Sequence, residues 1–357
     1  MEEVNVMQTD FHFYAVYALA RAAGFNPGDS HTVAYSSEHT DEAKYEHALK
    51  FENGGRFQQV LTAHRYLHHR ADALEICYRI WLPFHFLPGN LGVDFYERMV
   101  TRPGGPIAKR LIVDLLSANH KPYFLHRLGI LLHCYADTWS HQNFLGVTHK
   151  TLNKVRRLKV AGLSNSEIRS IIKWLKKRFK EYTLPGLGHA QAGTIPDEPY
   201  REWEYQNYAA TKQHVTNSMR ALDAARNCYE VMPGFLTAFA EHYSHDNPLP
   251  WHELAITFKK LFQINADLDT RIKAWKDAIS SGVFGFKVDD RDRKLNYDDR
   301  QWFREAVTVK IGENNPELYE RKNGFETSNW KYFHDAAAFH RFTVLHEVLP
   351  EHGMICG

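Results

Sequence analysis

One segment of the chain combines an apolar helix with residue types that bind metal ions. Residues 128–146 read LGILLHCYADTWSHQNFLG and place His133, Asp137 and His141 at four-residue intervals. At about 100° per residue, these three side chains and His126 fall within roughly 80° of one another on a helix. A carboxylate buried there without a partner would destabilise the fold, and a divalent cation would offset that cost. The spacing therefore predicts a metal site on this helix face.

Other parts of the chain carry the same residue types. A lone histidine on an apolar face is more often a hydrogen-bonded core residue than a ligand, so each of them alone is weak evidence. Imidazole and carboxylate groups together form the ligand set of zinc and similar ions. The candidate ligands are Asp10, His12, Asp41, His64, His133, Asp137, His141, His189 and Asp197. The sequence leaves open whether the site also includes His68, His85, His126, His334 or His340.

The hydrophobic pattern predicts the fold class. Apolar residues recur mostly at helical spacing, and alternating runs typical of strands are scarce. We therefore expect an all-α fold, a multi-helix bundle with long structured loops and a metal cluster between helices. The expected helices cover residues 11–24, 38–50, 57–80, 106–121, 128–146, 164–182, 202–229, 233–243, 251–280 and 329–349. We expect one domain, 1–357, in which residues 201–357 pack on a metal-binding core formed by residues 1–200.

The composition indicates neither a nucleic-acid nor a membrane partner. Lys and Arg total 44 and Asp and Glu total 42, so the net charge of +2 produces no strong overall field. No apolar run reaches about 18 residues, and the acidic start MEEVNVMQTDFHF lacks signal-peptide features. The four cysteines are far apart and form no CxxC pair, as is typical of reduced thiols. We therefore expect a cytoplasmic protein.

Several rival enzyme classes find little support. The chain contains neither the GxSxG motif of a serine hydrolase nor the GxxxxGK[ST] phosphate loop. His334 and Asp335 form the HD pair of another phosphohydrolase class, but that class needs a further aspartate downstream. No aspartate follows Asp335. The HD interpretation therefore fails on ligand number.

Long phrases relate nearly the whole chain to a known family. They are DFHFYAVYALARAAGF, VAYSSEHTDEA, PFHFLPG, HRLGILLHCYADTWSHQNFLG, SNWKYFHDAAAFHRF and LPEHGMICG, in this order. These phrases resemble an uncharacterised bacterial all-helical domain family. The order of the candidate ligands is more distantly similar to that of the zinc-dependent phospholipase C and P1 nuclease superfamily, helical hydrolases with a trinuclear zinc cluster.

The distant resemblance implies an assignment of ligands to metals. One metal would take Asp41, His64, His133 and the bridging Asp137, and a second would take Asp137 with Asp10 or His12. A third would take His141 and His189, with Asp197 as a further candidate. That superfamily also uses the amino group of a processed N-terminal tryptophan, whereas here Met1 lies nine residues before Asp10. Its spacing from the helix aspartate to the next histidine differs too, so two metals are easier to defend than three.

We therefore expect a metal-dependent hydrolase, in particular a phosphoesterase or phosphodiesterase that uses a metal-activated water. Asp137 or Asp10 would take up the proton, and the substrate would be a small-molecule or lipid phosphoester. Two or three zinc ions are expected, although Mn, Fe and Ni also fit these ligand types. The alternative is a non-enzymatic helical scaffold or partner-binding protein with a structural metal. Such a structural site is normally closed and mononuclear, whereas this chain offers more ligands than one ion needs.

Overall fold

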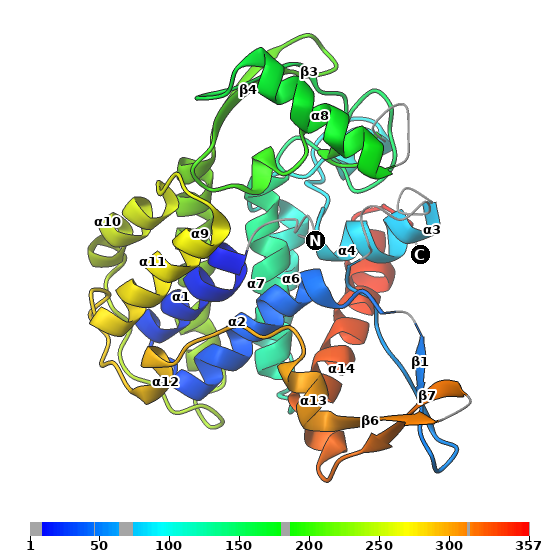
Figure 1. The fold of residues 1–357 in the computed structure, drawn as a ribbon, viewed down its shortest axis with the longest axis vertical. Coiled ribbons are helices and arrows are strands. Elements are labelled where there is room, and N and C mark those ends of the chain that lie inside the picture. The colour runs from blue at the N-terminus through cyan, green and yellow to red at the C-terminus, as the bar shows by residue number, and fades with distance from the viewer. Residues whose placement is uncertain (1–8, 46, 64–73, 180–185, 313–314, 357) are drawn as a thin grey trace.

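The computed structural model describes residues 9–45, 47–63, 74–179, 186–312 and 315–356 (Figure 1). The helices are α1 (Val16–Ala22), α2 (Pro27–Glu42), α3 (Leu74–Ile76), α4 (Leu82–Phe84), α5 (Phe95–Met99), α6 (Pro106–Ser117), α7 (Phe124–Ser140), α8 (Asn165–Phe179), α9 (Asn217–Ala238), α10 (Trp251–Phe262), α11 (Leu268–Ser281), α12 (Asp290–Arg293), α13 (Gln301–Ala306), α14 (Asn329–Phe342) and α15 (Leu349–Glu351). The π-helical segments are η1 (Asp10–Ala15), η2 (Cys77–Trp81) and η6 (Thr343–Val348).

The expectation of an all-α fold is wrong, because the protein is 55% helix and 11% strand and is therefore mixed α/β. The strands are β1 (Ala48–Lys50), β2 (Arg56–Gln58), β3 (Arg156–Val160), β4 (Glu202–Gln206), β5 (Lys212–Thr216), β6 (Val307–Gly312) and β7 (Asn315–Arg321). They form three small antiparallel sheets with the orders β1-β2, β3-β4-β5 and β6-β7. The sheets lie at the ends of the helical body (Figure 1).

Strand β4 shows why the hydrophobic pattern did not predict the sheets. Trp203 and Tyr205 are buried, and they alternate with the more exposed Glu202 and Glu204, which is the period of a strand. This alternation lasts only five residues, too few to stand out from the helical pattern that follows. The expected helix over 202–229 therefore begins only at Asn217.

A second correction concerns the segment after α2. Helix α2 ends at Glu42, and Ala43 leaves the helical region with φ −75° and ψ 73°. The carbonyl oxygen of Ala43 then accepts hydrogen bonds from the backbone N–H groups of Thr62 and Ala63. Because these tertiary contacts hold the helix end, Ala48–Lys50 form β1 instead of continuing the helix expected over 38–50.

Local sequence signals define several helix ends, of which only the end at Gly24 was predicted. The Asn26 side chain accepts a hydrogen bond from the Asp29 N–H group, and Pro27 occupies the first turn of α2. Gly24 follows α1 with φ +107°, a conformation that side chains with a Cβ rarely adopt. Ser328 caps α14 by accepting a hydrogen bond from Lys331.

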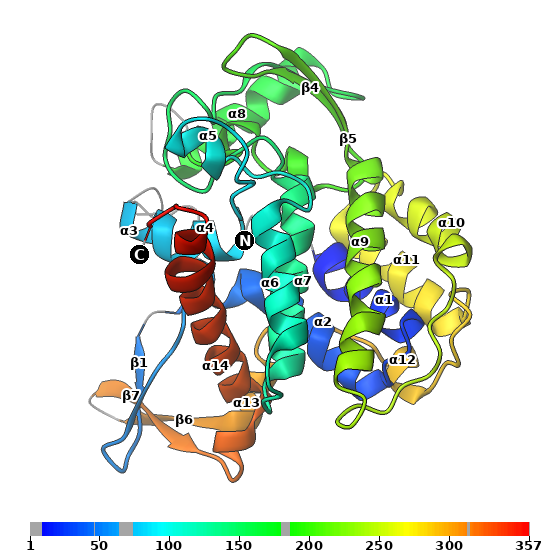
Figure 2. The same ribbon diagram turned by 180° about the vertical axis from the view of Figure 1, so that it is seen from behind.

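Helix α7 occupies the centre of the fold, with α2, α6, α9 and α14 packed around it (Figures 1 and 2). The contact with α2 is close at Gly129. A Cβ atom there would lie 2.3 Å from the carbonyl oxygen of Val33 and 2.5 Å from the Cβ atom of Ser36. Only glycine therefore allows α2 and α7 to approach this closely.

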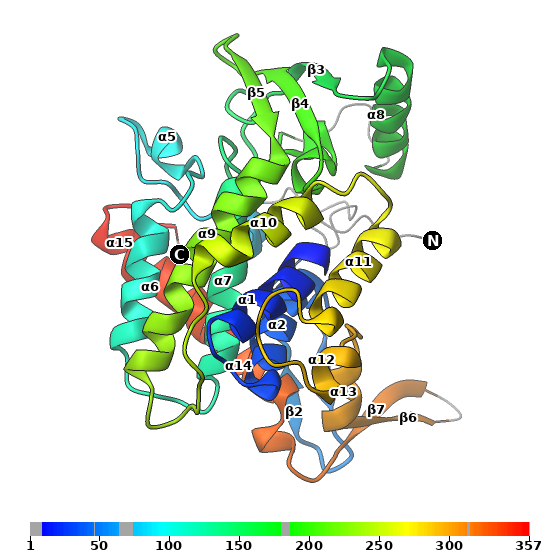
Figure 3. The ribbon, with the colours of Figure 1, turned by 90° about the vertical axis from the view of Figure 1, so that its left-hand side faces the viewer.

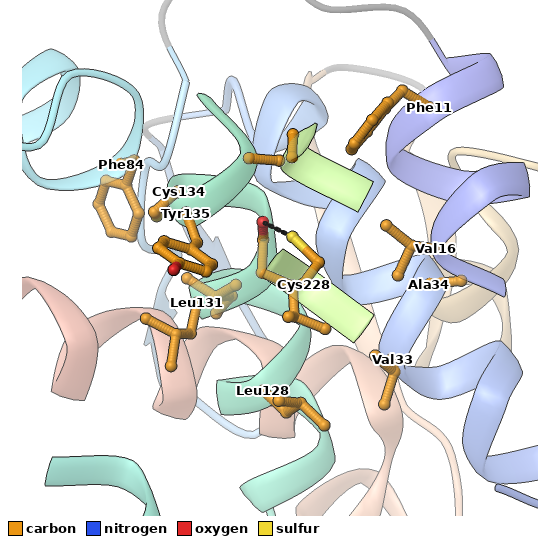
Figure 4. Close-up of a cluster of buried hydrophobic side chains, with 14 of the residues drawn as sticks. Phe11, Val16, Val33, Ala34, Phe84, Leu128, Leu131, Cys134, Tyr135 and Cys228 are labelled. Atoms are coloured by element: carbon orange, nitrogen blue, oxygen red, sulfur yellow. Dashed lines mark hydrogen bonds between the residues drawn. The ribbon is translucent and has the colours of Figure 1, made fainter. Parts of the chain in front are cut away.

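Apolar side chains from several helices fill the space around α7 (Figure 4). Val16 of α1, Val33 of α2 and Leu128 of α7 are completely buried. On the α9 side, the Cys228 thiol donates to the carbonyl oxygen of Leu132 over 3.7 Å. The core is therefore continuous from the first helix to the second half of the chain.

Buried ion pairs join the second half of the chain to its beginning. Helix α11 packs against η1, the segment that leads into α1 (Figure 3). Arg271 of α11 donates from Nε to the Asp10 carboxylate over 2.7 Å, and both side chains are buried. Arg21 of α1 donates likewise to Asp292 over 2.9 Å. The first helices are thus fixed against residues 261 and 271 positions later.

Among the described helices, none is long and apolar enough to cross a membrane. The longest of them, α9, has 22 residues. Its apolar residues are interrupted by charged side chains, namely Arg220, Asp223, Arg226 and Glu230.

The contact at Gly129 yields a paired prediction for stability. Gly129→Ala forces α2 and α7 apart and should lower the free energy of unfolding by about 1–3 kcal/mol, the usual cost of overpacking. In Gly234→Ala, on α9, the new Cβ would meet only the Leu116 Cδ1 atom at 3.7 Å. That variant should gain up to about 1 kcal/mol from helix propensity. Urea unfolding measures both changes, and equal stabilities for the two variants would contradict this account of the interface.

Candidate metal centre

The candidate metal centre is built from five parts of the fold. His12 comes from η1, Asp41 from the last turn of α2, His85 from the position after α4, and His133 and Asp137 from α7. His141 follows the last residue of α7, and the segment after α8 supplies His189, which precedes the 3₁₀ helix η3 (Ala190–Ala192), and Asp197, which ends the 3₁₀ helix η4 (Ile195–Asp197). All of these side chains are buried. They form three groups that could hold a metal ion: His12, His133 and Asp137; Asp41, His85 and His133; and His141, His189 and Asp197.

Asp137 lies between the imidazoles of the centre. Its Oδ1 atom is 3.3 Å from His12 Nε2, and its Oδ2 atom is 3.4 Å from both His133 Nε2 and His85 Nδ1. Asp137 Oδ2 is also 3.6 Å from His141 Nδ1. The four-residue spacing along α7 therefore positions one carboxylate where it can bridge neighbouring ions.

Asp41 completes the second group from the side of α2. Its Oδ1 atom lies 3.5 Å from His85 Nδ1 and 3.8 Å from His133 Nε2. His85 Nδ1 and His133 Nε2 are themselves only 3.2 Å apart. His133 thus belongs to two groups at once, so that the three groups comprise eight different side chains.

The third group lies at the end of α7. Asp197 Oδ1 is 3.4 Å from His141 Nε2, and Asp197 Oδ2 is 3.6 Å from His189 Nε2. Because His141 also approaches Asp137, this group is adjacent to the other two. The centre is therefore one continuous cluster rather than several separate sites.

Backbone carbonyl groups orient three of the histidines. His85 Nε2 is 2.8 Å from the Thr62 carbonyl oxygen, His141 Nδ1 is 2.7 Å from that of His85, and His189 Nδ1 is 2.9 Å from that of Gly193. A carbonyl oxygen only accepts, so each of these nitrogens carries the proton. In a neutral imidazole the other nitrogen then presents a lone pair toward the carboxylates, as a metal-ligating histidine does.

Lone pairs and carboxylates that face each other need a cation between them. His141 Nε2 and both Asp197 oxygens lack a hydrogen-bond partner within the described ranges, as do Asp137 Oδ1 and Asp41 Oδ2. Buried polar atoms are rarely left unpaired, because each costs about 1–3 kcal/mol. Divalent metal ions fit this donor set and would satisfy these atoms together.

The pKa shifts show the same demand for positive charge. Burial would lower the pKa of His141, but Asp137 and Asp197 raise it to about 9. Burial would raise the pKa of Asp137, but the His141 and His133 imidazoles hold it well below its ordinary value. In the absence of a metal, a proton on His141 therefore supplies part of the charge that the carboxylates require.

Burial also keeps three of the histidines in the neutral form that binds metal, whereas it disfavours the ionised form of Asp41. It lowers the pKa of His12, His133 and His189 and so favours their neutral imidazoles. Burial raises the pKa of Asp41 to about 6, although the nearby His85 and His12 oppose this shift. Because metal binding displaces protons from such groups, affinity for the metal should fall in acid.

The structure brings most of the sequence-predicted ligands together. These are His12, Asp41, His133, Asp137, His141, His189 and Asp197. Asp10 lies outside the three groups because its Oδ2 atom is paired with Arg271, although its Oδ1 atom has no hydrogen-bond partner in the described structure. The predicted ligand His64 and the open candidate His68 lie outside the described residues.

His85 is the centre residue whose role the sequence left open. It lies within WLPFHFLPG, where its apolar surroundings are equally typical of a core histidine. Three other open candidates have protein partners elsewhere: His126 contacts Asn329, His334 contacts the Val60 N–H group, and His340 contacts the Pro83 carbonyl group. The rigid, doubly proline-flanked position of His85 is the one sequence signal that distinguishes it from these three.

Comparison with known proteins shows the family of the chain. The chain belongs to a family of unknown function (DUF6765), which matches residues 7–348. No curated protein and no solved structure matches it. Membership of an uncharacterised domain family is therefore confirmed, whereas none of these comparisons ties the chain to the zinc-dependent phospholipase C and P1 nuclease superfamily.

Buried histidines outside the centre predict acid-sensitive stability of the metal-free protein. Burial lowers the pKa of His126 and of His334 from 6.5 to about 3. Below about pH 6.5 the unfolded chain thus binds protons that the folded chain does not. The free energy of unfolding keeps its full value above that pH and falls toward pH 3 by about 1.4 kcal/mol per pH unit for each histidine. In His126→Gln, the free energy of unfolding, measured by urea unfolding in EDTA at several pH values, should fall less steeply with decreasing pH, by about that amount. An unchanged dependence of the free energy of unfolding on pH would contradict the prediction.

Metal binding should stabilise the folded protein. Zinc at a free concentration about 100-fold above its dissociation constant should raise the free energy of unfolding by about 2.7 kcal/mol for one site. Asp137→Asn should lose most of this gain, because Asp137 faces four imidazoles. His340→Gln should keep it, since His340 is equally buried but lies outside the three groups. Thermal unfolding with and without zinc makes the comparison, and equal stabilisation of wild type and Asp137→Asn would rule out this centre.

Proposed function

We propose that this member of the DUF6765 family is a metal-dependent hydrolase that cleaves phosphoester bonds with two or three divalent ions. The observation that carries the proposal is the sharing of ligands. His133 belongs to two groups, and Asp137 lies within 3.6 Å of His141, which belongs to the third. A structural ion is normally held in a closed site by four protein ligands. Adjacent ions with shared ligands are instead typical of phosphoryl-transfer and hydrolytic sites.

The chain's own residues would hold and orient the reacting groups. When bound, divalent ions supply Lewis acidity that polarises phosphoester oxygens and lowers the pKa of a water molecule. Asp137, held in its ionised form by two imidazoles, would fix the spacing of the ligand groups. Asp10 retains an Oδ1 atom without a partner in the described structure and would hold the proton released from water. Arg271 fixes the other oxygen of Asp10 and so orients it.

The proposed substrate is a small-molecule or lipid phosphoester, and zinc is the proposed metal. The order of ligands along the chain, which is similar to that of zinc-dependent phospholipase C and P1 nuclease, supports both choices. Imidazole and carboxylate ligands also suit Mn, Fe and Ni. Ion identity therefore needs a direct comparison of the four metals in the same assay.

One observation favours the alternative of a structural metal. All eight side chains of the centre are buried, as is usual for a site that stabilises a fold. In that case the protein would be a scaffold or partner-binding protein with one tightly held ion. Metal stoichiometry separates the two functions, because the hydrolase needs at least two ions.

The test combines metal content with hydrolysis. Untagged protein, reconstituted separately with Zn, Mn, Fe or Ni, is assayed with bis(p-nitrophenyl) phosphate and p-nitrophenylphosphorylcholine, and metals are counted by inductively coupled plasma mass spectrometry. We expect two or more ions per chain and hydrolysis that EDTA abolishes. Asp137→Asn should lose ions and at least about 100-fold of the activity, more than the loss of an outer partner of a ligand usually costs.

His126→Gln is the matched control for this assay. His126 is a buried histidine on the same helix as Asp137, but it contacts Asn329 and belongs to none of the three groups. This variant should keep both the ions and the activity. A single ion per chain without hydrolysis of either substrate would instead identify a structural metal, and metal-free protein after reconstitution would exclude both functions.

A further inference from the structure

The positive charge of the chain is concentrated in one segment. Residues 150–179, which contain β3 and α8, include ten Lys and Arg residues and one acidic residue, Glu167, and so carry a net charge of +9. Because the whole chain carries only +2, its other residues together carry −7. The small overall charge therefore conceals a local basic segment, which can attract an anionic partner that the net charge does not indicate.

The structure places these cations on one part of the surface. Helix α8 packs against β3, and together with the β3-β4-β5 sheet it lies at one end of the molecule (Figures 1 and 3). Seven of the ten cations have described side chains, six of them exposed and Lys154 partly buried, namely Lys150, Lys154, Arg156, Arg157, Lys159, Arg169 and Lys173. We call the surface that these seven residues form the basic face.

The cations of the basic face lack anionic partners. None of the seven side chains forms an ion pair or a hydrogen bond with another residue in the described ranges. Exposed cations elsewhere are paired, as Arg226 is with Glu230 at 3.0 Å and Lys273 is with Asp277 at 2.6 Å. Unpaired like charges repel one another. An anionic partner would offset this repulsion, so the basic face is complementary to a surface of negative charge.

Trp174 distinguishes between anionic partners. Its side chain is 48% exposed, although it follows Lys173 and precedes the basic run 176–178 on α8. Ile168 is buried on the inner side of the helix, and Trp174 lies about 120° from it around the helix axis. An exposed indole beside lysines and arginines is typical of a helix that lies in a membrane interface, where the cations meet lipid phosphates and the ring enters the headgroup layer.

A nucleic acid matches the basic face less well. Proteins that bind single strands stack successive bases on several aromatic side chains in a groove. In residues 150–179, Trp174 is the one aromatic residue whose side chain the structure describes. The phosphates of a duplex would pair with the cations but would give the indole no apolar surroundings. The observations therefore favour a lipid surface.

We propose that the basic face binds the surface of a membrane that is rich in anionic phospholipids. Cations of β3 and α8 would contact lipid phosphate groups, and the Trp174 indole would enter the headgroup layer. This inference goes beyond the proposed function, because such binding requires neither a metal ion nor hydrolysis. His189 and Asp197 lie in the segment between α8 and β4. The same part of the fold would thus carry the membrane contact and two ligands of the metal centre.

Co-sedimentation of the full chain with lipid vesicles tests the proposal. One set of vesicles contains phosphatidylglycerol and phosphatidylcholine in equal parts, and the other contains phosphatidylcholine alone. We expect saturable binding to the anionic vesicles at about 0.1 M salt and at least about tenfold weaker binding at about 1 M salt, where the Debye length is about 3 Å. Binding to phosphatidylcholine alone should also be at least about tenfold weaker.

Two variants assign the binding to the basic face. The double variant Arg169→Gln, Lys173→Gln removes two charges from α8 and should weaken binding at least about tenfold, because each basic residue near an anionic membrane strengthens binding about fivefold. Trp174→Ser keeps every charge and should weaken binding at least about fivefold, since the indole no longer enters the headgroup layer. All three side chains are exposed, so the variants should fold as wild type does.

The double variant Arg226→Gln, Lys273→Gln is the matched control. It removes the same two charges from α9 and α11, where both cations are paired with carboxylates, and it should bind the vesicles as wild type does. Equal binding to the two kinds of vesicle, or equal losses in the control and in the α8 double variant, would overturn the proposal. Tighter binding of a DNA duplex than of the anionic vesicles at the same salt concentration would also overturn it and assign the basic face to nucleic acid.

Discussion

Neutralisation of the buried Asp137 carboxylate is the requirement around which this structure is arranged. A carboxylate at the centre of the fold is stable only if positive charge or hydrogen-bond donors surround it. Here four imidazoles approach it within 3.6 Å, from η1, from the position after α4, and from α7 and its end. The placement of α7 among its neighbours thus determines both the core packing and the charge balance of the centre.

The packing of the helices and the geometry of the centre depend on the same contacts. The close approach of α2 to α7 at Gly129 brings the end of α2, with Asp41, to the histidines of α7. Carbonyl groups of Thr62, His85 and Gly193 then fix the rings of three ligands. A change in the backbone at any of these carbonyl groups would rotate a ligand without altering it chemically.

The sequence predicted the part of the centre that is encoded locally. The intervals between His133, Asp137 and His141 follow from helical geometry, and those side chains do converge. His126 lies on the same helix face but is seven residues from His133, or about 10 Å along the axis, so it contacts Asn329 instead. Angular position alone could not reveal this, because a metal site also requires ligands at the same height.

Long-range contacts account for what the sequence could not predict. The proximity of Asp10 to His12 in sequence suggested a ligand, but Arg271, 261 positions later, pairs with its carboxylate. Likewise, the buried and exposed residues of β4 alternate over only five residues, so the strand is defined by its pairing with β3 and β5. Such pairings depend on contacts between segments that are far apart in the sequence, so a local sequence pattern does not predict them.

The spread of the ligands along the chain has a consequence for biosynthesis. The first ligand, His12, and the last, Asp197, are 185 positions apart, and the neighbouring Asp10 awaits Arg271. During translation, the third ligand group can be completed only after more than half of the polypeptide has left the ribosome. Nascent chains therefore hold unmatched histidines and carboxylates for most of their synthesis. Any metal ion that the three groups hold together would therefore be bound late, after the first 197 residues have been made and folded around it.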